Sequence, residues 1–164
     1  MNNMRRGFTM IELIFVIVII GILAAVAIPK LSATRDDAKI SSIVANTRTI
    51  AEDVKNFYTA QGETNWLAAK VTDVTDVPLF TNNTCTTQAT SATVFPGTPL
   101  YICDDSADVL AITSTTAAPI SLTLTQGSST STIATALTTD KVFQALTDGA
   151  TGKTTVLGGQ KVVR

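Results

Sequence analysis

An uninterrupted apolar segment near the N-terminus, residues 8–28, constrains the fold of this chain more than any other feature. Its only polar side chains are Thr9 and Glu12. As a helix the segment would be about 31 Å long, which is enough to cross the hydrocarbon core of a bilayer. A carboxylate inside such a segment costs on the order of 2.5–3.5 kcal/mol at mid-membrane and less near the end. We therefore expect Glu12 to have a functional partner.

The basic residues around this segment predict its orientation. Arg5 and Arg6 precede it, and the next basic residue is Lys30. Because Lys and Arg stay on the cytoplasmic side of a membrane, the N-terminus is expected inside and the chain after Lys30 outside.

A cut between Gly7 and Phe8 would remove both arginines and create a new ammonium at Phe8. In a packed core of low dielectric, this ammonium would meet Glu12 of a neighbouring, axially shifted copy, and the pair would set the register of the copies. In these features the chain resembles the type IV prepilin family, which includes pilins and type II secretion pseudopilins. The resemblance covers about residues 5–31 and consists of a short basic leader followed by Gly7, Phe8, Thr9, Glu12, Gly21 and Pro29.

The resemblance implies a processing and assembly route. A prepilin peptidase would cleave after Gly7, Phe8 would be N-methylated, and the apolar helices would pack into a filament core. The implied partners are copies of the chain, related pilins, the peptidase and an inner-membrane assembly platform. The precursor would span the inner membrane once with its N-terminus in the cytoplasm, and the mature chain would enter a periplasmic or surface filament. Gly21 and Pro29 are weak points of the helix, and the resemblance implies that the helix between them can unwind in the filament.

Three other interpretations of the apolar segment stay open at this point. Ala25-Val26-Ala27 fits the cleavage pattern of an ordinary secretory signal. The pair Arg5-Arg6 fits a twin-arginine export signal. The segment can also be an uncleaved single-span anchor in which Glu12 snorkels toward the interface. None of the three accounts for both the Gly7-Phe8 pair and Glu12.

Helical periodicity continues beyond Pro29, with apolar residues recurring every three or four positions to about Tyr58. Gln61-Gly62 is expected to end this helix, with Gly62 as a left-handed cap. The predicted organisation is a cleaved leader at 1–7, a transmembrane and polymerisation helix at 8–29, an amphipathic continuation at 30–60 and an extracytoplasmic β-rich domain at 61–164.

The rest of the chain predicts a small sheet. Residues 100–102, 109–112 and 120–125 are rich in β-forming residues, and the last run alternates as a half-buried strand does. A short helix is expected at 140–146 with Thr139 as its N-cap, and a final hairpin is expected from 154–157 and 161–163. The predicted fold class is α+β and pilin-like: a long N-terminal helix packed on a small antiparallel β-sheet domain.

Cys85 and Cys103 are the only cysteines. Outside the cytoplasm an even pair is expected to be bonded, and two thiols are too few for a structural zinc site. The sequence therefore predicts a structural Cys85–Cys103 disulfide.

The sequence shows almost no residues for catalysis. The chain contains no His, its net charge is −1, and no basic residue lies between Lys70 and Lys141. This composition indicates neither a nucleic-acid partner nor a cofactor, and no nucleotide-binding or hydrolase motif occurs. Calcium is the one open possibility, through Asp104, Asp105 and Asp108, although such a cluster also fits a solvated turn.

We therefore expect a structural subunit and not an enzyme, namely a type IV pilin or a type II secretion pseudopilin. The alternatives are a membrane-tethered extracytoplasmic binding module or adhesin, and a minor pilin for DNA uptake.

Overall fold

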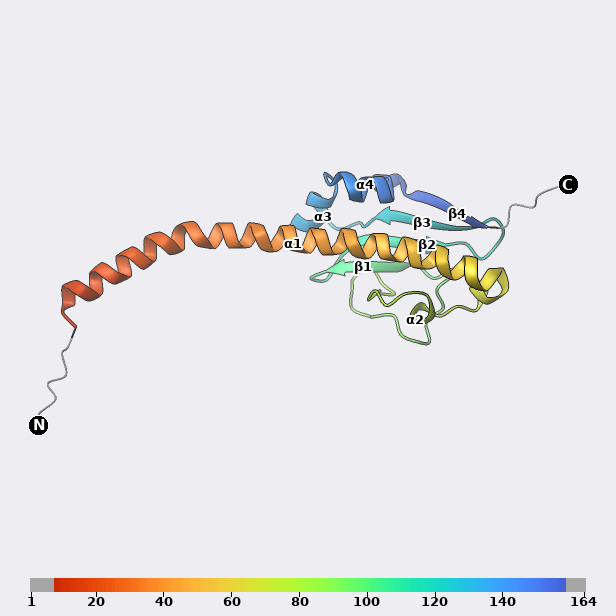
Figure 1. The fold of residues 1–164 in the computed structure, drawn as a ribbon, viewed down its shortest axis with the longest axis horizontal. Coiled ribbons are helices and arrows are strands. Elements are labelled where there is room, and N and C mark those ends of the chain that lie inside the picture. The colour runs from red at the N-terminus through yellow and green to blue at the C-terminus, as the bar shows by residue number, and fades with distance from the viewer. Residues whose placement is uncertain (1–7, 159–164) are drawn as a thin grey trace, which may run out of the picture. The chain divides into compact units, whose positions relative to one another are not determined.

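The computed structural model describes residues 8–158. The chain divides into two compact units, Met1–Ala38 and Lys39–Arg164, here called unit 1 and unit 2. A long helix, α1 (Met10–Leu67), begins in unit 1 and ends in unit 2, where a four-stranded antiparallel sheet completes the fold (Figure 1). This arrangement confirms the predicted α+β, pilin-like class.

Unit 1 is a single helical segment without a core of its own. Its large apolar side chains are between 42% and 84% exposed, from Ile19 at the low end to Phe8 at the high end. Gly21 and Pro29 both lie within helical backbone. By length and composition this part of α1 can cross a membrane. Unit 1 by itself therefore presents apolar surface on every side.

In unit 2 one face of α1 is buried. Ile43, Thr47, Ile50, Ala51 and Val54 are its buried residues between positions 39 and 58, and their spacing of three or four keeps them on one side of the helix. Thr47 is polar, but its hydroxyl donates to the carbonyl of Ile43 at 2.8 Å, so the group is satisfied inside the core.

The helix does not end at Gly62 as predicted. Gly62 does adopt the expected left-handed φ of 74°, but its ψ is 177° and helical backbone resumes until Leu67. The reason is the burial of Trp66, which is fully inside the core. Its ring centroid lies 5.4 Å from that of Phe95 and 6.1 Å from that of Tyr58. The glycine kink redirects the last turn so that this indole joins the core.

Four strands form the sheet in the order β1, β2, β3, β4, and all neighbours are antiparallel. The three predicted strands are confirmed as β1 (Leu100–Asp104), β2 (Ala107–Ser114) and β3 (Ile120–Gln126). Strand β4 (Lys153–Gly158) contains the predicted strand at 154–157, but it pairs with β3. The predicted hairpin partner at 161–163 lies outside the described residues.

The inner face of the sheet packs on α1 (Figure 1). Alternate residues of the first three strands are almost completely buried and form one hydrophobic cluster with Ile43, Ile50 and Val54 of α1; these strand residues are Leu100, Ile102, Leu110, Ile112, Ile120, Leu122 and Leu124. Burying each such side chain contributes roughly 1.5–3 kcal/mol. The strict alternation along β3 is the pattern that made this strand predictable.

Short helices complete unit 2: α2 (Val71–Val74), α3 (Thr132–Leu137), α4 (Lys141–Thr147) and the 3-10 turn η1 (Gly149–Thr151). The predicted cap of α4 was wrong by one residue, because the carboxylate of Asp140, and not Thr139, accepts from the amide of Phe143 at 2.7 Å. Helix α3 was not predicted; Ser131 caps it by accepting from the amide of Ala134.

The predicted disulfide is confirmed. Cys85 and Cys103 are bonded, and their sequence separation is 18. Cys103 belongs to β1, whereas Cys85 lies in a loop whose Phe80 exchanges two backbone hydrogen bonds of 2.9 Å with Tyr101 of β1. The disulfide and these hydrogen bonds fasten the loop to the first strand.

Removing this disulfide is expected to destabilise the chain by roughly 3 kcal/mol, from the entropy of closing a loop of this length. The paired Cys85→Ala, Cys103→Ala variant should therefore melt well below the unaltered chain in a thermal scan. Thiol titration of the unreduced protein should find no free thiol. Two titratable thiols in that sample would show that the bond is not formed in the native protein.

Candidate functional site

The start of α1 carries the one acidic group in the apolar part of the chain. The Glu12 carboxylate (Oε2) accepts from the Thr9 hydroxyl at 3.2 Å and from the Thr9 amide at 3.4 Å. In return, the Thr9 hydroxyl accepts from the Glu12 amide at 3.4 Å. This reciprocal arrangement is a capping box, which satisfies amide groups that the first helical turn leaves without partners. This contact was not predicted from the sequence, although the Thr-x-x-Glu spacing of residues 9–12 was the signal for it.

Glu12 also lies beside apolar surface. Together with Phe8, Leu13, Val16 and Ile17 it lines a shallow hollow of about 200 Å³ on unit 1. The first turn of α1 is the positive end of the helix dipole, and this positive end stabilises the negatively charged carboxylate of Glu12. Within unit 1 no basic residue is described before Lys30. None of the side chains that line this hollow is basic, so the hollow itself offers Glu12 no cationic side chain.

The residues of the predicted cleavage site are only partly described. Phe8 is described and is 84% exposed, whereas Gly7 lies outside the described residues. Cleavage and methylation at this position therefore stay predictions.

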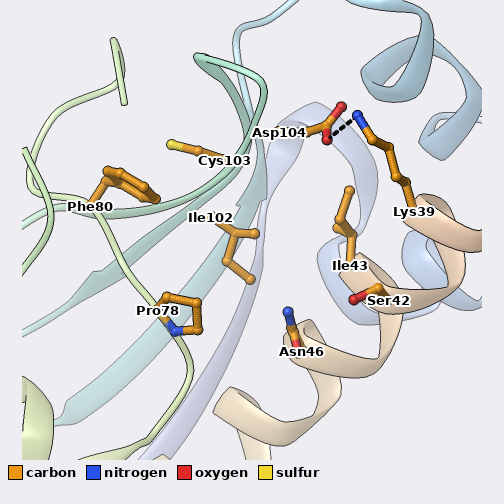
Figure 2. Close-up of a pocket in the computed structure, with 9 residues that line it drawn as sticks. All are labelled: Lys39, Ser42, Ile43, Asn46, Pro78, Phe80, Ile102, Cys103 and Asp104. Atoms are coloured by element: carbon orange, nitrogen blue, oxygen red, sulfur yellow. Dashed lines mark ion pairs between the residues drawn. The ribbon is translucent and has the colours of Figure 1, made fainter. Parts of the chain in front are cut away.

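A second candidate site is a groove in unit 2, between α1 and the first strand (Figure 2). It has a volume of about 170 Å³. One wall comes from α1, and the other wall and the floor come from the segment before β1 and from β1 itself. The lining residues are Lys39, Ser42, Ile43, Asn46, Pro78, Phe80, Ile102, Cys103 and Asp104. Most of this lining is apolar, and its charged groups gather at the Lys39 end, as Figure 2 shows.

The charged end of the groove is an ion cluster of Lys39, Asp104 and Asp105. The Lys39 ammonium lies 2.9 Å from a carboxylate oxygen of Asp104 and 2.5 Å from one of Asp105. The two aspartates are brought there by the tight β1–β2 turn, in which Asp105 and Ser106 have φ values of 45° and 72°. Positive φ at both central residues is typical of two-residue hairpin turns.

The ion cluster keeps Lys39 charged. Its hydrogen bonds to Asp105 and then to Asp104 raise the pKa of Lys39 above its ordinary value of 10.5. This cluster was not predicted from the sequence, because nothing in the local pattern links position 39 to positions 104 and 105.

The geometry does not support calcium at the three predicted aspartates. Asp104 and Asp105 face Lys39, whereas Asp108 is buried and accepts from the amide of Ser128 at 2.7 Å. Between residues 8 and 158, no group of three acidic, Cys or His side chains is placed to hold a metal ion.

Comparisons with known proteins bear on the N-terminal part of the chain. Residues 2–28 match the family described as the prokaryotic N-terminal methylation motif. The chain is 38% identical over 79 residues to a fimbrial protein of Neisseria meningitidis serogroup A, which covers 47% of this chain and 46% of that protein. It is 38% identical over 63 residues to the type IV major pilin protein PilE1 of Neisseria gonorrhoeae, covering 38% of each.

A third relative is the type IV major pilin protein PilA of Myxococcus xanthus, which is 42% identical over 57 residues, covering 35% of this chain and 26% of that protein. The chain thus spans less than half the length of these relatives. No solved structure matches. The methylation motif and the pilin relatives confirm the resemblance to the type IV prepilin family over the N-terminal part of the chain.

Proposed function

We propose that this chain is a structural subunit of a type IV pilus, cleaved after Gly7 and assembled through the apolar part of α1. The observation that carries this proposal is the helix of unit 1, whose large apolar side chains are all at least 42% exposed and whose first turn holds Glu12. Such a surface is unstable in water and needs either lipid or other copies of itself around it.

The helix would be surrounded by lipid before assembly and by other copies of itself after assembly. Before assembly, the helix would sit in the inner membrane as a single span, with Arg5 and Arg6 on the cytoplasmic side. An assembly platform in that membrane would then move the subunit into the filament. This transfer from membrane to filament is feasible because neighbouring helices in the filament bury the same apolar side chains that lipid buried in the membrane.

Cleavage would supply a cationic partner for Glu12. Once the leader is removed, Phe8 begins the chain with an ammonium group, which N-methylation leaves charged. In a parallel bundle of helices, the Phe8 ammonium of one copy reaches Glu12 of another when the copies are shifted by four residues, about 6 Å. This pair would fix the axial register of the filament, since either charge alone in the core is costly.

The names of the relatives favour a pilus over a secretion pseudopilus, because the matched proteins are a fimbrial protein and major pilins. A membrane-tethered binding module or adhesin is the alternative from another class. It would use the same apolar helix as an anchor, but it would need neither cleavage at Gly7-Phe8 nor the charge of Glu12. A structural role in either form involves no catalysis and no bound cofactor.

Surface filaments sheared from cells that express this chain provide the test of the proposal. Mass spectrometry of the sheared fraction should show this chain beginning at Phe8 with one additional methyl group, and electron microscopy should show filaments. The membrane fraction of the same cells is the control for unassembled subunit. If the chain is found only in membranes and retains Arg5 and Arg6, it is a tether and the pilus proposal is wrong.

A further inference from the structure

We infer that the exposed face of α1 in unit 2 is a contact surface between copies, on which Arg48 of one copy pairs with Glu52 of the next. This inference rests on the proposed function, because it needs copies of α1 that lie side by side and parallel in a filament. It names a contact within unit 2 that helps to determine specificity, which the Phe8–Glu12 pair does not supply.

Arg48 and Glu52 lie on the side of α1 that faces away from the core of unit 2. Both residues are exposed, whereas the neighbouring helix positions Thr47, Ile50 and Ala51 are buried. Positions four apart lie on one face of a helix, about 6 Å apart along its axis. The two residues therefore place charges of opposite sign in a short row on the exposed face.

Neither charge is used inside the chain. Within residues 8–158 the side chains of Arg48 and Glu52 make no hydrogen bond or ion pair. Their order is the less favourable one for pairing along a single helix, since an acidic residue four positions before a basic one is preferred and here the basic residue comes first. Both groups are thus available to a partner, and a second copy of the same helix offers the complementary charges at the same spacing.

A shift of four residues brings the two charges level. When one α1 is displaced by four residues, about 6 Å, along a parallel neighbour, Arg48 of the first copy lies level with Glu52 of the second. Packed helices have axes about 8–10 Å apart, a gap that these two long side chains can bridge. Ala45 and Thr49, which are exposed on the same side of the helix, have short side chains that leave room for this approach.

The pair joins copies head to tail. Each copy uses Arg48 toward one neighbour and Glu52 toward the other, so the contact is not completed by two copies. Heterologous contacts of this kind build open helical filaments. Phe8 and Glu12 are also four residues apart, so the pair proposed for unit 1 and the Arg48–Glu52 pair require the same shift between copies.

Charge reversal tests this contact, with the yield of sheared filaments as the measurement. Arg48→Glu sets two carboxylates level at every contact and Glu52→Arg sets two guanidinium groups level, so each variant alone should lower the yield roughly tenfold. Lys55→Glu is the matched control, because it makes the same change of charge as Arg48→Glu on another exposed residue of α1. At this shift position 55 lies level with Thr59, which carries no charge, so the control yield should stay within about twofold of the unaltered yield.

Cells that make both single variants provide the sharper test. Where Arg48→Glu and Glu52→Arg copies alternate along a filament, each contact again joins one acidic and one basic side chain, so co-expression should restore most of the yield. No copy in this mixture carries opposite charges at positions 48 and 52, so pairing inside one helix cannot account for the rescue. The double variant with both changes in one chain should also assemble by itself.

Thermal melts separate a folding defect from an assembly defect. Both positions are exposed, so the variants should melt within a few degrees of the unaltered chain. Normal yield from either single reversal would overturn the inference, and so would failure of the mixture to assemble under conditions in which the unaltered chain does. Absence of filaments from the unaltered chain would refute the proposed function, and the inference with it.

Discussion

Replacing Glu12 with Val is expected to abolish filament assembly when no unaltered subunit is present. The variant helix is more apolar, so the precursor should still insert into the membrane and be processed. In the filament, however, the ammonium of Phe8 would lose its counter-charge in a core of low dielectric, at a cost of roughly 3–5 kcal/mol per contact. Sheared filament yield, compared with the amount of processed subunit in membranes, is the measurement.

The capping box provides matched controls for this prediction. Glu12→Gln keeps an acceptor for Thr9 and removes only the charge, whereas Thr9→Ala keeps the charge and removes the cap. If pairing between copies is the role of Glu12, the Gln variant should fail to assemble and the Ala variant should assemble. If the Gln variant forms filaments normally, Glu12 serves only to begin the helix.

Replacing Gly7 with Glu is expected to leave the full-length precursor in the inner membrane. A glycine on the leader side leaves the scissile bond unobstructed, and a bulky charged side chain would block the peptidase. Without cleavage, Arg5 and Arg6 remain attached, and the helix end cannot enter an apolar core because burying two guanidinium groups is prohibitively costly. Intact mass of the membrane-extracted chain measures the result.

Gly7→Ala is the control, because a methyl group adds little bulk next to the scissile bond. This variant should be processed to a chain that begins at Phe8. A mature chain that begins at Ile28 in the unaltered protein would contradict the prediction. It would show a conventional secretory signal and remove the proposed assembly helix altogether.

The elements that could be predicted are those whose local pattern and tertiary role agree. Strand β3 alternates apolar and polar residues, and the structure buries its apolar positions. The apolar unit 1 helix is likewise evident from composition alone. In both cases the side chains of a short segment determine its secondary structure, with no information needed from distant residues.

The errors arose where distant contacts decided the outcome. Gly62 had the signal for a helix end, but burial of Trp66 against Phe95 carries helical backbone five residues farther. The ion cluster joins Lys39 to a hairpin turn far along the chain, so no local pattern could predict it.

The loop that carries Cys85 also determines how the sheet ends. Strand β1 is the first strand of the sheet, and its outer backbone groups pair with Phe80 of this loop through only two hydrogen bonds. A strand whose outer edge is open is a template for unwanted pairing with other chains. Burial of Leu79 and Phe95 holds the two ends of this loop, and the disulfide adds a covalent link between its middle and β1. The disulfide therefore helps to keep this edge of β1 covered against pairing with other chains, in addition to stabilising the fold.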